Sequence, residues 1–197
     1  DGITLPILSV GGIGCISVAS NVAPRQMVAI VDKFFAGDVE GAARMQKELY
    51  PLIKSQMEAL VAGVPYPVAN LANASALLNQ ALADINWVGF YLREGDKLVL
   101  GPFQGKTACI EIPFGRGVCG TAAVKDETQL VMDVHQFPGH IACDSASNSE
   151  IVIPLHKDGA VAAVLDIDSP LVGRFDQQDQ SGLEQLCQLL QNGCDWE

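Results

Sequence analysis

The first part of the chain places hydrophobic residues at helical spacing, with glycine and proline between the apolar runs. We expect a short apolar helix or turn near the N-terminus, a buried strand at Gly14–Ser20, and a helix that begins at Pro24. Gly37 should end that helix, and Asp38 should cap the helix that follows it. The pattern therefore predicts that residues 1–49 form a mainly helical N-terminal segment.

Two further helices are predicted before the pattern changes. One should begin near Tyr50 and end before Gly63, and the next should span residues 67–82. The residues expected to face a core are Ile53, Met57, Leu60 and Val61 in the first of these helices, and Leu71, Ala74, Leu78 and Leu82 in the second.

From Trp87 onward, short apolar runs of strand type alternate with turn residues. The predicted strands are Trp87–Leu92, Lys97–Pro102, Ile110–Pro113, Leu130–Asp133, Glu150–Leu155 and Ala160–Asp168. Helices are predicted at Gly117–Lys125 and at Asp176–Leu190, with an irregular loop over residues 135–148. This order predicts an α+β fold, in which helices flank a central, mostly antiparallel sheet of five to six strands.

Composition limits the classes of protein that can carry this pattern. Of the 197 residues, 49% are hydrophobic, which suffices for a substantial core, and the low charged fraction disfavours long disorder. The net charge of −11 argues against a nucleic-acid partner, because no basic stripe is available to displace counterions. We also expect no membrane span and no secretory signal, and the absence of an initiating methionine suggests a fragment or a processed chain.

Three of the six cysteines point to chemistry. Cys109, Cys119 and Cys143 lie in glycine-rich or polar turns beside strand-like runs, where a thiol is accessible. A zinc site is disfavoured, because there is no C-x-x-C pair and only Cys143 has a nearby histidine, His140. The chain is also too large to need a disulfide scaffold. We therefore favour catalytic or sensing thiols over a metal site. Cys15, Cys187 and Cys194 are expected to have no catalytic role.

Six motifs around these cysteines occur in a family-specific order. They are W-V-G-F-Y-L, L-V-L-G-P-F-Q-G-K-T-A-C, G-R-G-V-C-G-T-A, F-P-G-H-I-A-C-D, S-N-S-E-I-V-I-P-L and V-L-D-I-D-S. Together they strongly resemble the free methionine-(R)-sulfoxide reductases, which are GAF-domain proteins that reduce the free amino acid. The resemblance covers about residues 50–190 and implies a GAF domain at residues 50–192. It also implies an oxidoreductase that converts free L-methionine (R)-S-oxide to L-methionine.

The resemblance assigns roles to the three thiols, and the required chemistry fits them. A thiolate can attack an electrophilic sulfoxide sulfur and become a sulfenic acid, and a second thiol then condenses with that acid to form a disulfide. By resemblance, Cys143 is the nucleophile, Cys109 the principal resolving thiol and Cys119 a further redox partner. The order in which Cys109 and Cys119 act stays open. Cys119 could instead be a buried core thiol.

Three carboxylates are predicted to line the pocket. Asp166 and Asp168 should share one face of a strand, because side chains alternate along it. A clustered and partly buried carboxyl group can hold a proton at neutral pH, which suits Glu150, or one of the aspartates, as the acid for the sulfoxide oxygen. The remaining carboxylates could bind the α-ammonium group of the substrate. A solvated strand end is the alternative for the two aspartates.

The resemblance further implies that Trp87 and Tyr91, four residues apart on one strand face, form walls of the pocket. Ordinary sheet core is the alternative for both. We expect the substrate carboxylate to meet backbone N–H groups of the 115–120 loop or the 139–144 loop. His140 could be a general base, although a loop hydrogen-bonding role is the simpler interpretation, and His135 and His156 are expected at the surface.

The N-terminal segment carries a second resemblance. T-L-P-I-L-S-V-G-G-I-G-C-I-S-V-A-S-N-V-A-P and the later G-D-V-E-G-A-A resemble the C-terminal end of the dihydrodipicolinate synthase family of (β/α)8 aldolases. Those aldolases need a Schiff-base lysine on an earlier strand, and one β/α unit cannot close an eight-stranded barrel. Residues 1–49 are therefore interpreted as a non-catalytic appendage that reflects ancestry or fusion.

The leading hypothesis also implies partners. We expect no bound cofactor and no metal, with thioredoxin as external reductant, supplied by NADPH through thioredoxin reductase. We expect a cytoplasmic protein that binds free methionine sulfoxide, with no nucleic-acid or membrane partner and with a homodimer left open. The competing hypotheses are a non-enzymatic GAF sensor of a small molecule or of redox state, and an aldolase-family protein.

Overall fold

The computed structural model describes residues 4–14, 24–47, 50–141 and 144–196. The chain divides into two compact units, Asp1–Ala59 and Leu60–Glu197. In the part of the chain that the structure describes, no helix combines the length and the apolar character that crossing a membrane requires.

The N-terminal unit is helical wherever it has regular structure in the described residues. It contains α1 (Thr4–Ser9), α2 (Pro24–Phe35) and α3 (Val39–Lys47), and α4 (Tyr50–Val61) runs across the division between the units. The predicted cap is present, because the Gly41 amide donates to Asp38 Oδ1 at 2.8 Å, and Gly37 before it has a φ of +84°. The predicted strand at Gly14–Ser20 lies, apart from Gly14, outside the described residues.

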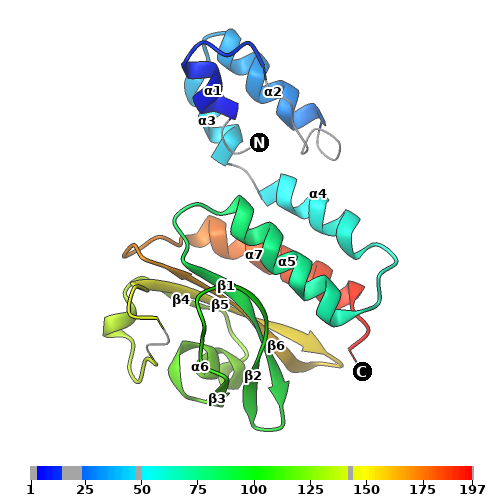
Figure 1. The fold of residues 1–197 in the computed structure, drawn as a ribbon, viewed down its shortest axis with the longest axis vertical. Helices are drawn as coiled ribbons and strands as arrows, with labels where there is room; N and C mark the ends of the chain where they lie inside the picture. Colours follow the sequence, from blue (N-terminus) through cyan, green and yellow to red (C-terminus); the bar gives the residue numbers. More distant parts are fainter. Residues whose placement is uncertain (1–3, 15–23, 48–49, 142–143, 197) are drawn as a thin grey trace. The chain divides into compact units, whose positions relative to one another are not determined.

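A six-stranded antiparallel sheet forms the centre of the second unit (Figure 1). The strands are β1 (Trp87–Glu94), β2 (Lys97–Gly105), β3 (Glu111–Pro113), β4 (Gln129–Val131), β5 (Ser149–Lys157) and β6 (Ala160–Ser169), in the spatial order β3-β2-β1-β6-β5-β4. This arrangement confirms the predicted α+β class, with every strand pair antiparallel.

Helices cover both faces of this sheet. Figure 1 shows α5 (Pro67–Ala81) and α7 (Gln177–Gly193) on one face of the sheet, and α6 (Gly117–Lys125) on the other. The expected inward residues of α5 are all buried. Asp176 caps α7 by accepting from the Gln178 and Asp179 amides, and the Asp179 side chain completes a capping box. The cap fixes the residue at which α7 starts.

Two sequence expectations fail for local reasons. Leu60 was expected in the core, but 37% of it is exposed. The strand predicted at Leu130–Asp133 is β4, which ends at Val131 because Asp133 caps the short 3-10 helix η2 (Val134–Gln136), accepting from the His135 amide at 3.0 Å. Polar capping therefore replaces the last residues of the expected strand.

Candidate active site

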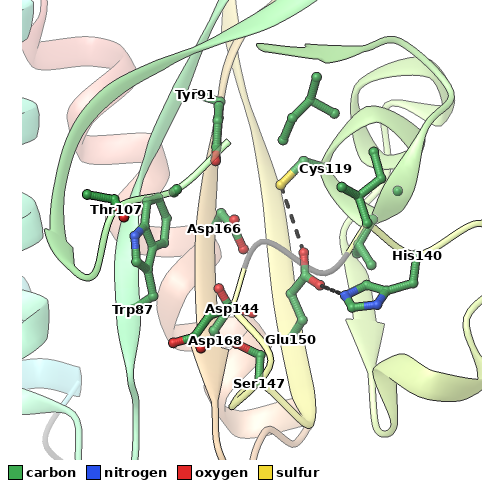
Figure 2. A pocket seen from close by; sticks show the side chains of 15 residues that line it. Trp87, Tyr91, Thr107, Cys119, His140, Asp144, Ser147, Glu150, Asp166 and Asp168 are labelled. Carbon is green, nitrogen blue, oxygen red and sulfur yellow. Dashed lines mark hydrogen bonds and ion pairs between the residues drawn. The ribbon is translucent and has the colours of Figure 1, made fainter. Parts of the chain in front are cut away.

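A pocket lies between α6 and the sheet face that α6 covers (Figure 2). Its floor comes from β1, β5 and β6, and residues 107–108, 140–141, 144 and 147 border it. The antiparallel register sets this floor, because Glu150 on β5 is paired with Asp168 on β6, and Trp87 on β1 is paired with the same aspartate from the other side. Three neighbouring strands thus direct side chains into one space.

The three predicted carboxylates all line this pocket. Glu150 and Asp166 are each 6% exposed, and the Asp166 Oδ1 atom has no hydrogen-bond partner among the described residues. Asp168 is half-buried, and its carboxyl group accepts a hydrogen bond from Ser147. The alternative of a solvated strand end does not fit the burial of Asp166.

Burial sets the protonation of this cluster. Loss of water, followed by the charges of Asp166 and Asp168, raises the pKa of Glu150 well above its ordinary range. Burial, followed by the charge of Asp168, likewise raises the pKa of Asp166 well above its ordinary range, so this pair of carboxyl groups holds a proton at neutral pH. Burial also raises the pKa of Asp168 from 3.8 to about 7, although the Ser147 hydrogen bond opposes that change. Glu150 can therefore donate a proton at neutral pH.

Cys119 on α6 belongs to the same cluster. The residue is 3% exposed, and its Sγ donates to Glu150 Oε1 over 3.9 Å. Burial, with the charges of Asp166 and Glu150, raises the pKa of this thiol well above its usual value, so it is protonated at neutral pH. Its redox role stays a prediction, and the structure describes a thiol that donates a hydrogen bond within the core.

The same cluster offers ligand atoms to a metal ion. Cys119 Sγ and one carboxylate oxygen each from Glu150 and Asp166 lie within 4.8 Å of one another. A metal would have to displace protons from groups whose pKa values burial has raised. The expectation of no metal stays a prediction.

An aromatic wall stands opposite the acidic cluster. The Trp87 and Tyr91 rings stack at 5.9 Å, and Phe103, which the sequence analysis did not single out, stacks on Trp87 at 5.4 Å. Trp87 and Tyr91 line the pocket and are also almost fully buried. Each ring therefore forms a pocket wall and is also part of the core of the sheet. Burial raises the pKa of Tyr91, which leaves its hydroxyl protonated as a donor.

The other two predicted thiols belong to segments between regular elements. Cys109 is half-buried, its sulfur takes part in a disulfide bond, and its carbonyl accepts from the Tyr91 hydroxyl at 3.1 Å. Cys143 lies outside the described residues, and Ile141 and Asp144, on either side of residues 142–143, both line the pocket. Cys187 and Cys194 are free thiols that do not line it.

Several pocket residues were not assigned from the sequence. Asp144 and Ser147 line it, and Asn86, just before β1, donates to both side chains. His140, considered only as a loop residue or a general base, places its Nε2 atom 3.8 Å from Glu150 Oε2, and burial lowers the pKa of His140. The motif F-P-G-H-I-A-C-D contains His140 and Asp144, but no periodicity in the sequence indicates that Asn86 or Ser147 turns toward the pocket.

Comparison with known proteins finds two families along the chain. The dihydrodipicolinate synthetase family matches residues 1–82, and the GAF domain family matches residues 71–193. A 4-hydroxy-tetrahydrodipicolinate synthase of Moorella thermoacetica is 53% identical over 55 residues, which are 28% of this chain and only 19% of that enzyme. The likeness of the first part is therefore a partial one.

The second part matches its relatives over most of their length. The free methionine-R-sulfoxide reductase of Escherichia coli is 56% identical over 144 residues, covering 73% of this chain and 87% of that protein. The solved structure of the free methionine-R-sulfoxide reductase of Neisseria meningitidis in complex with its substrate has a TM-score of 0.72 and 49% identity, covering 74% of this chain and 88% of that one. The chain therefore belongs to the GAF-domain family of free methionine-R-sulfoxide reductases.

Proposed function

We propose that this protein reduces free L-methionine (R)-S-oxide to L-methionine. The observation that carries the proposal is the burial of Glu150 beside Asp166 and Asp168, in a pocket with an aromatic wall, which raises the pKa of Glu150 well above its ordinary range. Family membership supports it, since two relatives, 56% and 45% identical, are named for this activity. A GAF sensor is not favoured, because a pocket for a regulatory ligand has no evident need for a buried acid beside a thiol.

The first chemical step joins the thiol and the acid. The Cys143 thiolate attacks the sulfoxide sulfur while Glu150 gives its proton to the oxygen, so the sulfur–oxygen bond of the substrate breaks and methionine leaves. The oxygen and its new proton move to the Cys143 sulfur as the transient bond between the two sulfurs breaks, which leaves Cys143 as a sulfenic acid. The fold contributes by burying Glu150, because burial keeps its carboxyl group protonated before the substrate binds.

The second step restores the thiols. The Cys109 thiol condenses with the sulfenic acid of Cys143, forming a disulfide and releasing water, and a thioredoxin dithiol then reduces that disulfide. NADPH, through thioredoxin reductase, would supply the electrons. A reducing cytoplasm suits such a cycle, because its disulfides are transient and catalytic.

Substrate choice follows from the pocket charge. The α-ammonium group of a free amino acid can pair with Asp166 and Asp168, and the buried Oδ1 atom of Asp166 has no hydrogen-bond partner in the described part of the chain. A methionine within a peptide brings a neutral amide to that place and would leave a buried charge unpaired. That mismatch costs roughly 3–5 kcal/mol, so discrimination of at least about a hundredfold is expected.

The test is a thioredoxin-coupled assay of NADPH consumption with four substrates. These are the R and S diastereomers of free methionine sulfoxide, N-acetylmethionine (R)-sulfoxide and a short peptide that contains the R sulfoxide. Only the free R diastereomer should give full catalytic efficiency. Equal efficiency on the N-acetylated compound would refute the acidic-pocket account, and inactivity on every sulfoxide would refute the proposed function.

A further inference from the structure

Two backbone segments border the pocket where the predicted redox thiols belong. One follows β2 and contains Lys106 and Cys109, and the other precedes β5 and contains Asp144 and Ser147. Side chains of the sheet hold the first segment at two carbonyls. Trp87 Nε1 donates to the Lys106 carbonyl and the Tyr91 hydroxyl donates to the Cys109 carbonyl, each at 3.1 Å. The resolving-thiol segment is therefore fixed to β1.

The second segment is held through Asp144 and Ser147. Asn86 Nδ2 donates to Asp144 Oδ2 at 3.2 Å and to Ser147 Oγ at 3.1 Å, and the Ala146 amide donates to Asp144 Oδ1 at 3.0 Å. Asn86 is itself fixed, because its backbone amide donates to the Asp168 carbonyl at 3.0 Å. Figure 2 shows Asp144, Ser147 and Asp168 gathered at one end of the pocket. The residue that directly follows Cys143 is thus anchored to the same sheet.

One ion pair crosses between the two segments. Lys106 Nζ lies 3.1 Å from Asp144 Oδ2 and 3.3 Å from Asp144 Oδ1. The Asp144 side chain is only 12% exposed, whereas that of Lys106 is 70% exposed. The carboxylate is therefore the more constrained partner of the ion pair, and the lysine side chain extends over the surface to reach it. The Ala146 amide and then Lys106 lower the pKa of Asp144, so this carboxylate is charged at neutral pH.

We propose that Asp144, with Asn86 and Lys106, is a positioning residue for the thiol-condensing step, because it ties the segment of the sulfenic acid to the segment of the resolving thiol. This inference rests on the proposed function. In that step the sulfenic S–O bond of Cys143 breaks, a bond forms to the Cys109 sulfur, and the hydroxyl leaves as water with the Cys109 proton. The two sulfurs must meet in the correct orientation, and limiting their relative freedom raises the rate of that encounter.

The same contacts explain why the first step should not depend on the Lys106–Asp144 ion pair. Neither Asn86 nor Lys106 lines the pocket, and proton donation rests on Glu150, which neither residue contacts. Loss of the crossing pair should therefore separate two events that occur together in the intact protein. Methionine release should stay fast, and disulfide formation should lag behind it.

The experiment is a single turnover of reduced protein with free methionine (R)-sulfoxide, without thioredoxin. Methionine release is followed by chromatography, loss of protein thiols by titration, and sulfenic acid by trapping with dimedone. Lys106→Met should release methionine at the wild-type rate, lose its second thiol about two- to fivefold more slowly, and trap more dimedone. Asp144→Asn, which also weakens the Asn86 and Ala146 contacts, should slow thiol loss about tenfold. Lys97→Met, which removes an exposed pair with Glu111 on β3, is the matched control.

The outcomes separate the two claims. Thiol loss at the wild-type rate in both Lys106→Met and Asp144→Asn would overturn the positioning role while leaving the reductase activity intact. Equal slowing of methionine release and thiol loss in Lys106→Met would also overturn it, since a general structural defect slows both. Wild-type protein that releases no methionine would instead overturn the proposed function itself.

Discussion

The acidic side and the thiol side of the pocket are built in different ways. Glu150, Asp166 and Asp168 project from paired strands inside the sheet, whereas Cys109 and Cys143 belong to segments that connect regular elements. A preorganised electrostatic group gains from rigidity, because its environment must keep its pKa shifted throughout the cycle. Two thiols that must meet in the correct orientation gain instead from contacts that limit the relative freedom of their segments, such as the Lys106–Asp144 pair. Under the proposed function, the difference separates the carboxyl groups that prepare the site electrostatically from the thiols that form and break bonds.

The largest expected effect lies on the thiol side. Cys143→Ser should abolish methionine release, with a loss of several orders of magnitude, because a serine hydroxyl is a far poorer nucleophile than a thiolate. Rapid-quench measurement of methionine in a single turnover checks this. Cys109→Ser is the control, which should release about one methionine per protein molecule and then stop turning over with thioredoxin. Stoichiometric reduction by Cys143→Ser would move the nucleophile to another residue.

On the acidic side, Glu150→Gln should slow the chemical step by about 10²–10⁴-fold, because an amide cannot donate the proton that the raised pKa of Glu150 keeps available. Asp166→Asn and Asp168→Asn should instead raise KM for the free amino acid more than they lower kcat. Steady-state kinetics of the three variants side by side checks this division. If Glu150→Gln changed KM alone, the proton donor would have to be an aspartate.

The acidic side should also affect stability, and only within a defined pH range. The pKa of Asp168 is about 7 in the folded protein and 3.8 ordinarily, so between about pH 4 and pH 7 the folded state binds more protons than the unfolded state. Stability therefore falls as pH rises through that range. At pH 8, Asp168→Asn should remove this cost and stabilise the fold by about 1–3 kcal/mol, allowing for the partial exposure of the carboxyl group.

Urea denaturation of wild type and Asp168→Asn at pH 8 and pH 4.5 measures that gain. The difference between the two proteins should be largest at pH 8 and should shrink toward zero at pH 4.5. A variant that is less stable than wild type at pH 8 would mean that the Asp168 carboxylate is well paired in the fold and carries no burial cost.

The smallest effect on sulfoxide reduction is expected from removal of the N-terminal segment, residues 1–49, which contributes no residue to the acidic side or to the thiol side. Deleting residues 1–49 should change sulfoxide reduction by no more than a few-fold, and the full chain should show no aldolase activity. The active site of an eight-stranded aldolase barrel is assembled from the ends of several strands, and the described residues of the first unit contain helices and no strand. Coupled assays of both activities, with circular dichroism as a folding control, check this. If the protein without residues 1–49 failed to fold, those residues would have to be part of the hydrophobic core of the GAF domain.

The strands of the sheet could be predicted from the sequence where apolar and polar side chains alternate between neighbouring residues. Asp166 and Asp168 alternate with Leu165 and Ile167, which are fully buried, so the sequence predicted both the strand and the shared face of its carboxylates. The Asn86 network was not predictable in this way. It joins polar residues from irregular segments that are far apart in the chain, and only tertiary contacts bring them together.

The short edge strands of the sheet affect how copies of this protein can associate. β3 and β4, the two outermost strands, are only three residues long, and β3 ends in Pro113, which has no amide hydrogen to offer. Long open edges invite another chain to add a strand, and short edges that contain proline are a common protection against this. We therefore expect that concentrated solutions of this protein resist edge-to-edge aggregation, and that any dimer forms through side-chain surfaces and not by joining two sheets into one.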